Sequence, residues 1–331
     1  MHRDALGLIA VVLLLGSACG RVGPTAGQAS ATRTASSPSV VATSPSCGVP
    51  AARGNSALVY DSNRQTLVLF GGSGREVYGD TWLRSGPCWQ QINPTTSPPA
   101  RSTAAAAFDP NAQVVLMFGG RTALDGWLDD TWTWNGSDWS LVQSAEHPSL
   151  RFAVAAFDPT ISKVVVYGLT SDYTASQTWT WAGAWQQVAV TSPPPRASGA
   201  IAFDPVSNSV ILFGGRSPDL SFLGDTWSFD GTSWTKLTPA NSPAPRQNQL
   251  AATVTGGVIL FGGDASGRSF FDTWRWDGRD WQLLSSAGSP AATWGAAGMT
   301  SIGSSAVILS YDSLNGTGQT YLLGQAGWAI T

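Results

Sequence analysis

Ionisable side chains are scarce in this sequence. Only 12% of its 331 residues are charged, and 18 Lys and Arg against 21 Asp and Glu give a formal net charge of −3. Nucleic-acid binding depends on a strong basic excess, so we expect no DNA or RNA partner. Histidine occurs only twice, and His147 is the one copy beyond the N-terminus. An imidazole-based metal site is therefore excluded, and we expect neither a metal nor another cofactor.

Long apolar runs are missing too. The N-terminal run from Ala5 to Leu15 is too short for a transmembrane helix, and it suits the core of a signal peptide. Arg3 precedes it, and Leu15-Gly16-Ser17-Ala18-Cys19-Gly20 ends it. This segment resembles the lipobox of bacterial lipoproteins, whose cysteine receives a lipid, although Gly16 departs from that pattern. The resemblance implies a signal peptide at residues 1–19 and lipidation of Cys19; an ordinary secretory signal is the alternative.

A segment rich in small and polar residues follows. Between Arg21 and Ser46, 18 of 26 residues are Ser, Thr, Ala or Pro. Such a composition cannot bury enough apolar surface to offset the entropy lost on ordering. We therefore expect residues 20–47 to be a disordered tether. With a lipid on Cys19, the tether would hold the next domain on the outer side of the bacterial cytoplasmic membrane; without the lipid, the protein would be secreted.

Cysteine is also rare, with three copies in the chain. Besides Cys19 there are Cys47 and Cys88, and two remaining thiols in an exported protein suggest a disulfide. The expected strand order places Cys47 near one face of the domain and Cys88 near the other, whereas a disulfide requires Cα atoms within roughly 7 Å. The sequence therefore leaves this pairing open.

What the sequence has in abundance is a repeat with a period of 46 to 50 residues, present six times. Its core is an apolar residue and two glycines, as in Phe118-Gly119-Gly120, with a Thr-Trp pair about eleven residues later and another Trp six or seven residues beyond. Two copies of the core are degenerate, at Tyr167-Gly168-Leu169 and Leu309-Ser310-Tyr311. A fixed period of this length indicates a repeat architecture.

Each repeat predicts four short antiparallel strands, most clearly in the second copy. Asp109-Pro110-Asn111-Ala112 is a turn between the first two strands, and Asn135-Gly136 is a hairpin signal between the last two. The glycine pair indicates crowded backbone or positive φ. The expected strands are Ser102–Phe108, Gln113–Phe118, Asp130–Trp134 and Trp139–Val142. Four strands per repeat and no helical periodicity predict the blades of a β-propeller.

The order of these elements resembles the kelch repeat: Pro-x-x-Arg, a small apolar strand, an Asp turn, an apolar-Gly-Gly core, Asp-x-Trp and a final Trp. The resemblance covers all six copies, although the sixth has Thr293 in place of the leading arginine. It implies an all-β, six-bladed β-propeller of four-stranded antiparallel blades over residues 48–331, similar to the kelch propeller of galactose oxidases. Because the repeats begin with a first strand and end with a fourth, we expect the ring to close without strand exchange.

The strand order places the blade connections and the loops after Gly-Gly on one face, here called the loop face, and the tight turns on the opposite turn face. Function concentrates in variable loops on a rigid scaffold, and the kelch resemblance implies peptide binding by the leading arginines and the residues after Gly-Gly. The candidate binding residues are the leading arginines Arg53, Arg101, Arg151, Arg196 and Arg246, the loop arginines Arg75, Arg121, Arg216 and Arg268, and the loop aromatics Tyr78, Trp127, Tyr173, Phe222 and Phe270.

A structural role for the leading arginines is the stronger interpretation. Four repeats carry both this Arg and the Asp of Asp-Thr-Trp, and the sixth has lost both. Joint loss suggests that each Arg pairs with the Asp of its own blade, namely Asp80, Asp130, Asp225 or Asp272. The third repeat has Arg151 but Gln177, so we expect Arg151 to be the arginine most free to bind. We expect the loop aromatics to pack between blades more than to contact a ligand.

These patterns favour a monomeric, non-catalytic binding propeller that presents its loop face to a protein or polysaccharide partner. The alternative is a carbohydrate-active enzyme that uses carboxylates of this face, such as Glu76, Asp125, Asp129 or Asp219. That enzyme requires two carboxyl groups roughly 5 to 10 Å apart, one of them with a raised pKa. A third hypothesis, an assembly role in the cell envelope, predicts that the largest exposed apolar patch lies on the side of the propeller.

Overall fold

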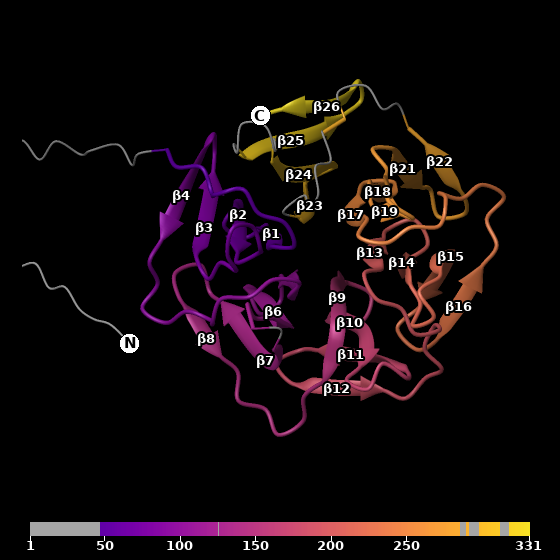
Figure 1. Ribbon diagram of the computed structural model, residues 1–331, viewed down its shortest axis with the longest axis horizontal. Coiled ribbons are helices and arrows are strands. Elements are labelled where there is room, and N and C mark those ends of the chain that lie inside the picture. The colour runs from indigo at the N-terminus through magenta and orange to yellow at the C-terminus, as the bar shows by residue number, and fades with distance from the viewer. Residues whose placement is uncertain (1–46, 125, 285–288, 291–297, 312–317) are drawn as a thin grey trace, which may run out of the picture. The chain divides into compact units, whose positions relative to one another are not determined.

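The computed structural model describes residues 47–331 except 125, 285–288, 291–297 and 312–317. These residues form six four-stranded antiparallel sheets, arranged as blades around a central channel (Figure 1). The first strand of each blade lines the channel, and the fourth strand lies at the outside. The predicted all-β, six-bladed propeller is confirmed.

Each blade contains four consecutive strands of the chain. Blade 1 contains β1 (Ala57–Asp61), β2 (Thr66–Phe70), β3 (Thr81–Ser85) and β4 (Cys88–Ile92). Blade 2 contains β5 (Ala105–Asp109), β6 (Val114–Arg121), β7 (Trp127–Trp134) and β8 (Trp139–Leu141). Blade 3 contains β9 (Leu150–Asp158), β10 (Lys163–Thr170), β11 (Ser176–Trp181) and β12 (Trp185–Val188). Blade 4 contains β13 (Ala200–Asp204), β14 (Ser209–Arg216), β15 (Phe222–Phe229) and β16 (Trp234–Leu237).

The last two blades follow the same order. Blade 5 contains β17 (Leu250–Val254), β18 (Gly257–Phe261), β21 (Thr273–Trp276) and β22 (Trp281–Leu283), with a small hairpin of β19 (Asp264–Ala265) and β20 (Arg268–Ser269) after its glycine pair. Blade 6 contains β23 (Gly298–Ile302), β24 (Ser305–Tyr311), β25 (Gly318–Gly324) and β26 (Gly327–Ile330).

Three central hairpins are longer than predicted because pairing continues past the glycine position. In blade 2 the pairing of β6 with β7 resumes after a bulge between Phe118 and Gly120. Gly119 and Gly120 have φ of 66° and 102°, a conformation that favours glycine. A Cβ on Gly120 would lie 2.8 Å from the backbone oxygen of Ser102. Since a bulge bends a strand without ending its pairing, much of the segment expected as a variable loop at 121–129 is strand.

An aspartate holds the turn between the first two strands of a blade. Asp109 Oδ1 accepts hydrogen bonds from the backbone N–H groups of Asn111 and Ala112 at 2.9 and 3.1 Å. This is the predicted side-chain cap of a tight turn. The same bond type fixes the turns that begin at Asp61, Asp158 and Asp204. These turn aspartates therefore give a reliable reference point for aligning one blade with the next.

A tryptophan on the fourth strand joins each blade to the one before it. Trp139 of blade 2 donates its indole N–H to Thr81 Oγ1 of blade 1 at 2.9 Å, and both side chains are buried. The same bond recurs at the other junctions, as Trp185–Thr131, Trp234–Thr178, Trp281–Thr226, Trp328–Thr273 and Trp89–Thr320. Each junction also buries an apolar cluster shared by the two neighbouring blades.

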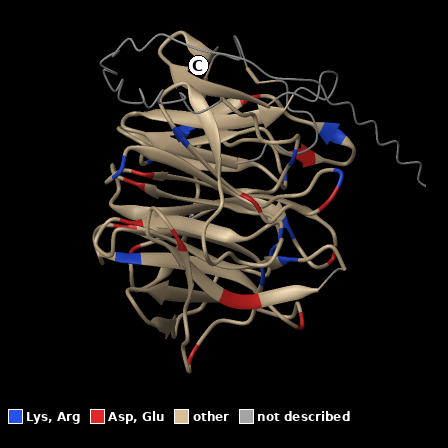
Figure 2. Cartoon of the chain, turned by 90° about the vertical axis from the view of Figure 1, so that its left-hand side faces the viewer, with Lys and Arg blue, Asp and Glu red and all other residues tan. Residues whose placement is uncertain are grey.

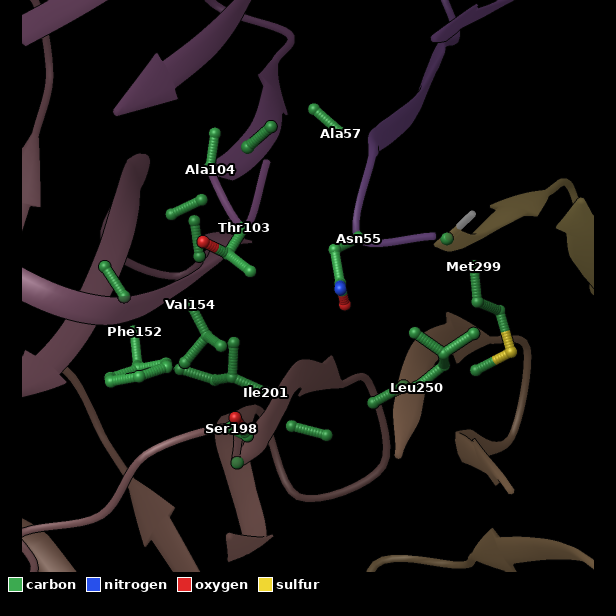
Figure 3. Close-up of a pocket in the computed structure, with 18 of the residues that line it drawn as sticks. Asn55, Ala57, Thr103, Ala104, Phe152, Val154, Ser198, Ile201, Leu250 and Met299 are labelled. Atoms are coloured by element: carbon green, nitrogen blue, oxygen red, sulfur yellow. The ribbon is translucent and has the colours of Figure 1, made fainter. Parts of the chain in front are cut away.

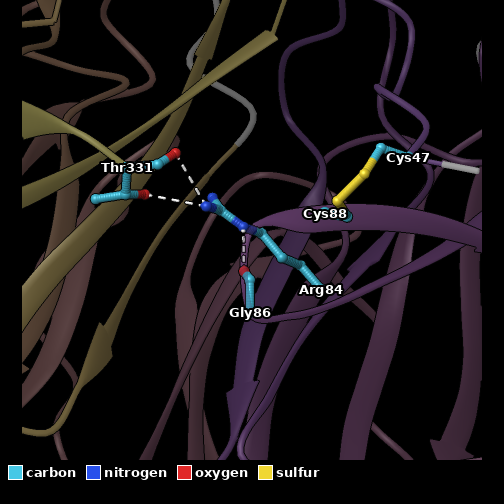
Figure 4. The surroundings of a disulfide bond; sticks show 5 residues. All are labelled: Cys47, Arg84, Gly86, Cys88 and Thr331. Atoms are coloured by element: carbon cyan, nitrogen blue, oxygen red, sulfur yellow. Dashed lines mark hydrogen bonds between the residues drawn. A yellow bond between two sulfur atoms is a disulfide. The ribbon is translucent and has the colours of Figure 1, made fainter.

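The ring closes between blades 6 and 1 without strand exchange, as predicted. Arg84 on β3 donates hydrogen bonds to the backbone oxygen and Oγ1 of Thr331 at 3.0 and 3.2 Å (Figure 4). Close by, Cys47 and Cys88 form a disulfide, with their Cα atoms 5.0 Å apart (Figure 4). The expectation that these cysteines lie near different faces is wrong, because the backbone pairing of Gly48 with Trp89 places the segment before blade 1 beside β4.

The N-terminal predictions lie outside the described residues. They concern the signal peptide at 1–19, the lipidated Cys19 and nearly all of the tether at 20–47. Asp125 and Thr293 lie outside as well. Within the described part of the chain, no helix is long and apolar enough to cross a membrane.

Candidate functional site

The loop face brings together the segment that leads into each blade and the hairpin that follows its glycine pair. Ser102 and Arg121 exchange backbone hydrogen bonds of 2.9 and 2.8 Å between these two segments. Equivalent bridges join Gly54 to Ser73, Ala197 to Arg216 and Gln247 to Asp264. The loop face thus has a hydrogen-bonded base, from which the hairpin tips project.

Four leading arginines are buried in ion pairs with the aspartates predicted for them. Arg101 is 1% exposed, and its two terminal nitrogens donate to the carboxylate oxygens of Asp130 at 2.6 and 2.8 Å. It also donates to the backbone oxygens of Pro99 and Gly119. The other pairs are Arg53–Asp80, Arg196–Asp225 and Arg246–Asp272. The predicted pairing is confirmed, and it leaves these four guanidinium groups inaccessible from the surface.

The partner carboxylates are held in their ionised form. Burial raises the pKa of Asp130, but the hydrogen bonds and charge of Arg101, with the hydrogen bond from Trp132, hold it below its ordinary value. The indole N–H of Trp132 donates to Asp130 Oδ2 at 2.8 Å. The pKa values of Asp80, Asp225 and Asp272 are lowered in the same way against the effect of burial. Each Arg–Asp–Trp unit therefore ties the leading segment to the third strand of its blade.

Blade 3 departs from this pattern by one residue. Arg101 stands eight positions before the turn aspartate Asp109, whereas the residue eight positions before Asp158 is Leu150. Leu150 is 1% exposed, so a leucine fills the place of the buried arginine. Gln177 stands where the other blades have aspartate, and its Oε1 accepts the indole N–H of Trp179 at 2.9 Å. Blade 3 thus replaces the ion pair by an apolar and an amide side chain.

The one-residue shift moves Arg151 to the surface. Its Nη1 donates to Asp129 Oδ1 of blade 2 at 2.6 Å, and the side chain is only 14% exposed. Ser149 donates to the other oxygen of Asp129 at 2.9 Å. Arg151 is therefore the most exposed of the five leading arginines, but it has an ion-pair partner that was not predicted, because the shortened leading segment places it beside Asp129.

The predicted loop aromatics take different positions. Tyr78 and Phe270 lie over leading arginines, with the guanidinium carbons 3.8 and 3.9 Å from their ring centroids. Trp127 packs edge-to-face against Phe152, with ring centroids 4.7 Å apart. Trp127 of blade 2 thus packs against the next blade, as expected, whereas Tyr78 and Phe270 each lie over an arginine of their own blade. Tyr173 is different, because it projects from its hairpin with 41% of its surface exposed.

The loop arginines divide into two groups. Arg121 and Arg216 are half-buried, and their guanidinium carbons lie 5.8 and 5.4 Å from the ring centroids of Trp127 and Phe222. Arg216 also donates from Nε to the backbone oxygen of Leu220 at 3.2 Å. The exposed members of the group are Arg75 and Arg268. The structure therefore gathers no cluster of exposed cations from the nine candidate arginines.

Apolar side chains occupy the hairpin tips of three consecutive blades, 2 to 4, and a fourth, Phe271, follows the hairpin of blade 5. Leu124 is 93% exposed, Leu220 62%, Phe271 44% and Tyr173 41%. Exposed apolar side chains occurring singly are ordinary, whereas a contiguous apolar patch indicates an interaction surface. Of these four residues, only Tyr173 is among the binding residues predicted from the sequence. The other three could have been found by asking which apolar residues fall in hairpins whose neighbours are polar.

Two of these tips are held in a fixed conformation. Tyr173 and Leu220 have φ of 61° and 71°, which is unusual for residues other than glycine. Beside Tyr173, Asp172 Oδ1 accepts hydrogen bonds from the Thr170 hydroxyl and the Thr174 N–H, at 2.5 and 3.1 Å. The bond from Thr170 is the main cause that lowers the pKa of Asp172 to about 2. Asp219, beside Leu220, makes the equivalent bonds within its own tip.

The mouth of the central channel was not recognised in the sequence. Five residues that follow the leading position by two form its rim, and all have φ between 50° and 58°: Asn55, Thr103, Phe152, Ser198 and Asn248. They open into a cavity of about 210 Å³ that the first strands of the blades line (Figure 3). The sixth equivalent position falls within 291–297, outside the described residues. The sequence marks these residues only by their position, since each rim residue stands six places before the last residue of the first strand of its blade.

Comparison with known proteins agrees with this architecture. Residues 177–313, from β11 into blade 6, match the family described as the KLHDC2/KLHL20/DRC7 Kelch-repeats domain. The fold is a kelch-type propeller. The resemblance seen in the repeats is thus confirmed at the level of the fold.

Two curated proteins illustrate how far this similarity extends. The chain is 37% identical over 78 residues to dynein regulatory complex subunit 7 of Chlamydomonas reinhardtii, covering 23% of this chain and 7% of that protein. It is 27% identical over 169 residues to an F-box/kelch-repeat protein of Arabidopsis thaliana, covering 44% of this chain and 35% of that protein. The chain therefore spans only a minor part of these relatives' lengths.

In the part of the chain that the structure describes, two of the carboxylates considered for acid–base chemistry, Asp129 and Asp219, are engaged by neighbouring groups. Charged positions are sparse and of mixed sign on the side shown in Figure 2. Asp129 is bonded by Arg151 and Ser149. The pKa of Asp219 is lowered, mainly by the hydrogen bond from Ser217, whereas a general acid requires a raised pKa. Among the described residues, no three His, Cys, Asp or Glu side chains lie together as metal ligands would.

Proposed function

We propose that this chain is a non-catalytic binding protein whose loop face docks onto a protein partner. Kelch propellers typically bind proteins. The observation that carries the proposal here is the series of exposed apolar tips on blades 2 to 4, all on the loop face. A few fully buried side chains near the centre of an interface supply most of the binding energy in protein complexes.

The chemistry of the tips favours a protein over a polysaccharide. Leu124 and Leu220 are aliphatic and project from the surface, whereas sugar rings are held by flat aromatic faces and by hydrogen bonds. Three of the five loop aromatics expected on this face, Tyr78, Phe270 and Trp127, are occupied by packing against other side chains. The lowered pKa values of Asp172 and Asp219 give no support to the alternative of a carbohydrate-active enzyme.

The location of the propeller belongs to the same proposal. A lipid on Cys19 and a tether over residues 20–47 would display the loop face outside a bacterial cytoplasmic membrane. This rests on the signal-like run and the lipobox-like segment of the sequence. The test is fractionation of cells that express Cys19→Ala. The variant should leave the membrane fraction, and its retention there would contradict a lipid anchor.

The binding role is tested by replacing three tips at once with serine, as Leu124→Ser, Tyr173→Ser and Leu220→Ser. A matched control replaces three exposed apolar residues of the outer strands, as Leu141→Ser, Leu283→Ser and Ile330→Ser. The exposed fractions are 93, 41 and 62% for the tips and 45, 61 and 62% for the controls. Partners recovered from envelope extract by wild type and by each variant are then compared by quantitative mass spectrometry.

We expect the control variant to recover the same partners as the wild type. The tip variant should lose them, because each buried apolar anchor contributes about 1 kcal/mol or more to an interface. Equal recovery by all three proteins would contradict binding through the loop face. Loss with the outer-strand variant alone would move the binding surface to the side of the propeller, as the hypothesis of an assembly role predicts.

A further inference from the structure

The channel mouth consists of a polar rim above an apolar belt. The rim carries amide and hydroxyl groups from Asn55, Thr103, Ser198 and Asn248, with Phe152 as its one described aromatic member. Beneath it the strands turn apolar side chains into the channel, which Figure 3 shows as Val154, Ile201, Leu250 and Met299. Val154 and Leu250 remain partly exposed. The mouth can therefore accept an apolar group in the belt and polar groups at the rim.

The described lining of this cavity contains no charged residue. The nearest arginines, in the leading position, are buried in ion pairs. Asp264 lies behind the rim, but its two carboxylate oxygens accept hydrogen bonds from Asn248 and Gln247 at 2.7 and 3.0 Å. An occupant that carried a charge into this cavity would lose its hydration without gaining a partner of opposite charge, which is costly. The occupant is therefore uncharged.

A buried acceptor in the cavity wall lacks a partner. Gln249 is 3% exposed and donates from Nε2 to the backbone oxygen of Phe213 at 2.8 Å. Its Oε1 is buried and has no hydrogen-bond partner among the described residues. Buried polar atoms are nearly always satisfied. The other blades have small side chains at this position, namely Ser56, Ala104, Ala153 and Gly199, so Gln249 adds an acceptor that packing does not require.

We infer that the channel mouth binds the tip of an uncharged loop of the protein partner, with one apolar side chain of that loop inserted into the belt. The rim amides and hydroxyls, with Gln249 Oε1, then bond the backbone N–H and C=O groups of the inserted tip. A sugar would match the rim but would place hydroxyl groups against Val154 and Leu250. This inference rests on the proposed function and adds the chemistry of the contact: a neutral, apolar anchor rather than a charged motif.

Methionine supplies a direct reporter of the cavity. The chain has three methionines; Met299 lines the cavity, whereas Met117 is 0% exposed between blades 1 and 2. Full-length protein labelled with ¹³C at the methionine methyl groups is titrated with N-acetyl-leucine-N-methylamide, a model of a leucine in a loop. The matching aspartate and lysine amides and glucose serve as comparison probes. The Met299 signal is assigned with Met299→Leu.

We expect the leucine probe to shift the Met299 signal saturably, with a dissociation constant on the order of millimolar for so small a ligand, and to leave the Met117 signal in place. Thr103→Lys and Ser198→Lys put a charge at the rim and should weaken the binding about tenfold or more. Gln65→Lys is the control, because Gln65 has the same positive φ of 53° on the turn face. An unchanged Met117 signal shows that each variant is folded.

Three results would overturn the inference. They are no shift of Met299 with the leucine probe, equal shifts with the aspartate or lysine probe, and a shift with glucose in place of the leucine probe. Failure of the proposed function is a separate outcome, since it is read from the serine variants of the hairpin tips. A silent Met299 with loss of partner from the tip variant would refute only the channel contact.

Discussion

Blade 3 supplies a natural test of the buried ion pairs, because it has Leu150 and Gln177 where blade 2 has Arg101 and Asp130. If the ion pair serves only to hold the blade together, the leucine and glutamine of blade 3 should maintain the stability of blade 2 when they replace Arg101 and Asp130. We therefore predict the stability of Asp130→Ala, of Arg101→Leu and of the double variant Arg101→Leu/Asp130→Gln. The two single variants each remove one member of the pair, and the double variant replaces both members by the residues of blade 3.

The exposed fractions of the two side chains decide which substitution should cost more stability. The Arg101 side chain is 0% exposed and that of Asp130 is 26% exposed. Asp130→Ala leaves a buried guanidinium without a counter-charge, which costs about 3–5 kcal/mol. Arg101→Leu leaves a carboxylate that water can reach, so about 1–3 kcal/mol is expected. The double variant should lie within about 1.5 kcal/mol of the wild type, since an apolar replacement of a buried pair is often close to neutral.

The assay is urea unfolding followed by tryptophan fluorescence, with partner recovery measured on the same proteins. The double variant should regain most of the free energy of unfolding lost by Asp130→Ala. In it, the introduced glutamine can accept the indole N–H of Trp132, as Gln177 accepts that of Trp179 at 2.9 Å. The reasoning is refuted if Asp130→Ala costs less than about 1 kcal/mol, or if the double variant is stable but recovers no partner. The second result would assign the arginine to binding.

Three further predictions concern stability. Thr131→Val removes the acceptor of the buried Trp185 indole N–H, 2.9 Å away, and should lower the free energy of unfolding by about 1–3 kcal/mol; no change in the urea midpoint would show that this bond is dispensable. Replacing Cys47 and Cys88 by serine opens a loop of sequence separation 41 and should cost about 4 kcal/mol in the chain-entropy account; free thiols in the unreduced wild type would contradict the bond. The four paired aspartates have lowered pKa values in the folded state, so their contribution is present above the unfolded value of 3.8 and is lost as the pH falls through the folded values. The urea concentration at the unfolding midpoint should therefore decrease as the pH is lowered below about 4. The decrease should be smaller in Arg101→Leu/Asp130→Gln. A midpoint that rises on acidification from this pH would contradict the assignment.

The repeat made the architecture predictable, because its signals are local. The turn at Asp109, the glycine pair at Gly119 and Gly120 and the final Trp139 each act within one blade or across one junction. Because these signals recur in register along the chain, one fold, the β-propeller, satisfies all of them. The ion pairs were predictable for the same reason, since Arg and Asp are present or absent together in every repeat except the third.

The details of blade 3 and of the hairpins were not predictable in the same way. Arg151 follows a proline by three positions, as the other leading arginines do, and only counting back from Asp158 shows that Leu150 holds the buried place. The hairpin extensions depend on a bulge that no residue type marks by itself. The disulfide depends on the path of the chain before β1, where only the pairing of Gly48 with Trp89 fixes the position of Cys47.

The channel mouth escaped sequence reasoning because its residues share a conformation and a position but no single residue type. Asn55, Thr103, Phe152 and Ser198 are four different amino acids. The three-dimensional ring brings them together around one axis (Figure 3). Aligning the repeats identifies the residues that build the blades, because those residues recur from one repeat to the next. A site of this kind instead forms at equivalent positions whose residue types differ between blades.

The most direct test of the central claim is photo-crosslinking in living cells that produce the protein. A photoreactive benzoylphenylalanine is introduced in place of Leu220 at the tip of blade 4, and in a second strain in place of Leu283 on the outer strand β22. The two leucines are 62 and 61% exposed, so the two probes are equally accessible from the solvent. A loop face that docks onto a protein predicts a discrete crosslinked partner from position 220 and none from position 283. Crosslinks from position 283 alone, or from neither position, would contradict it.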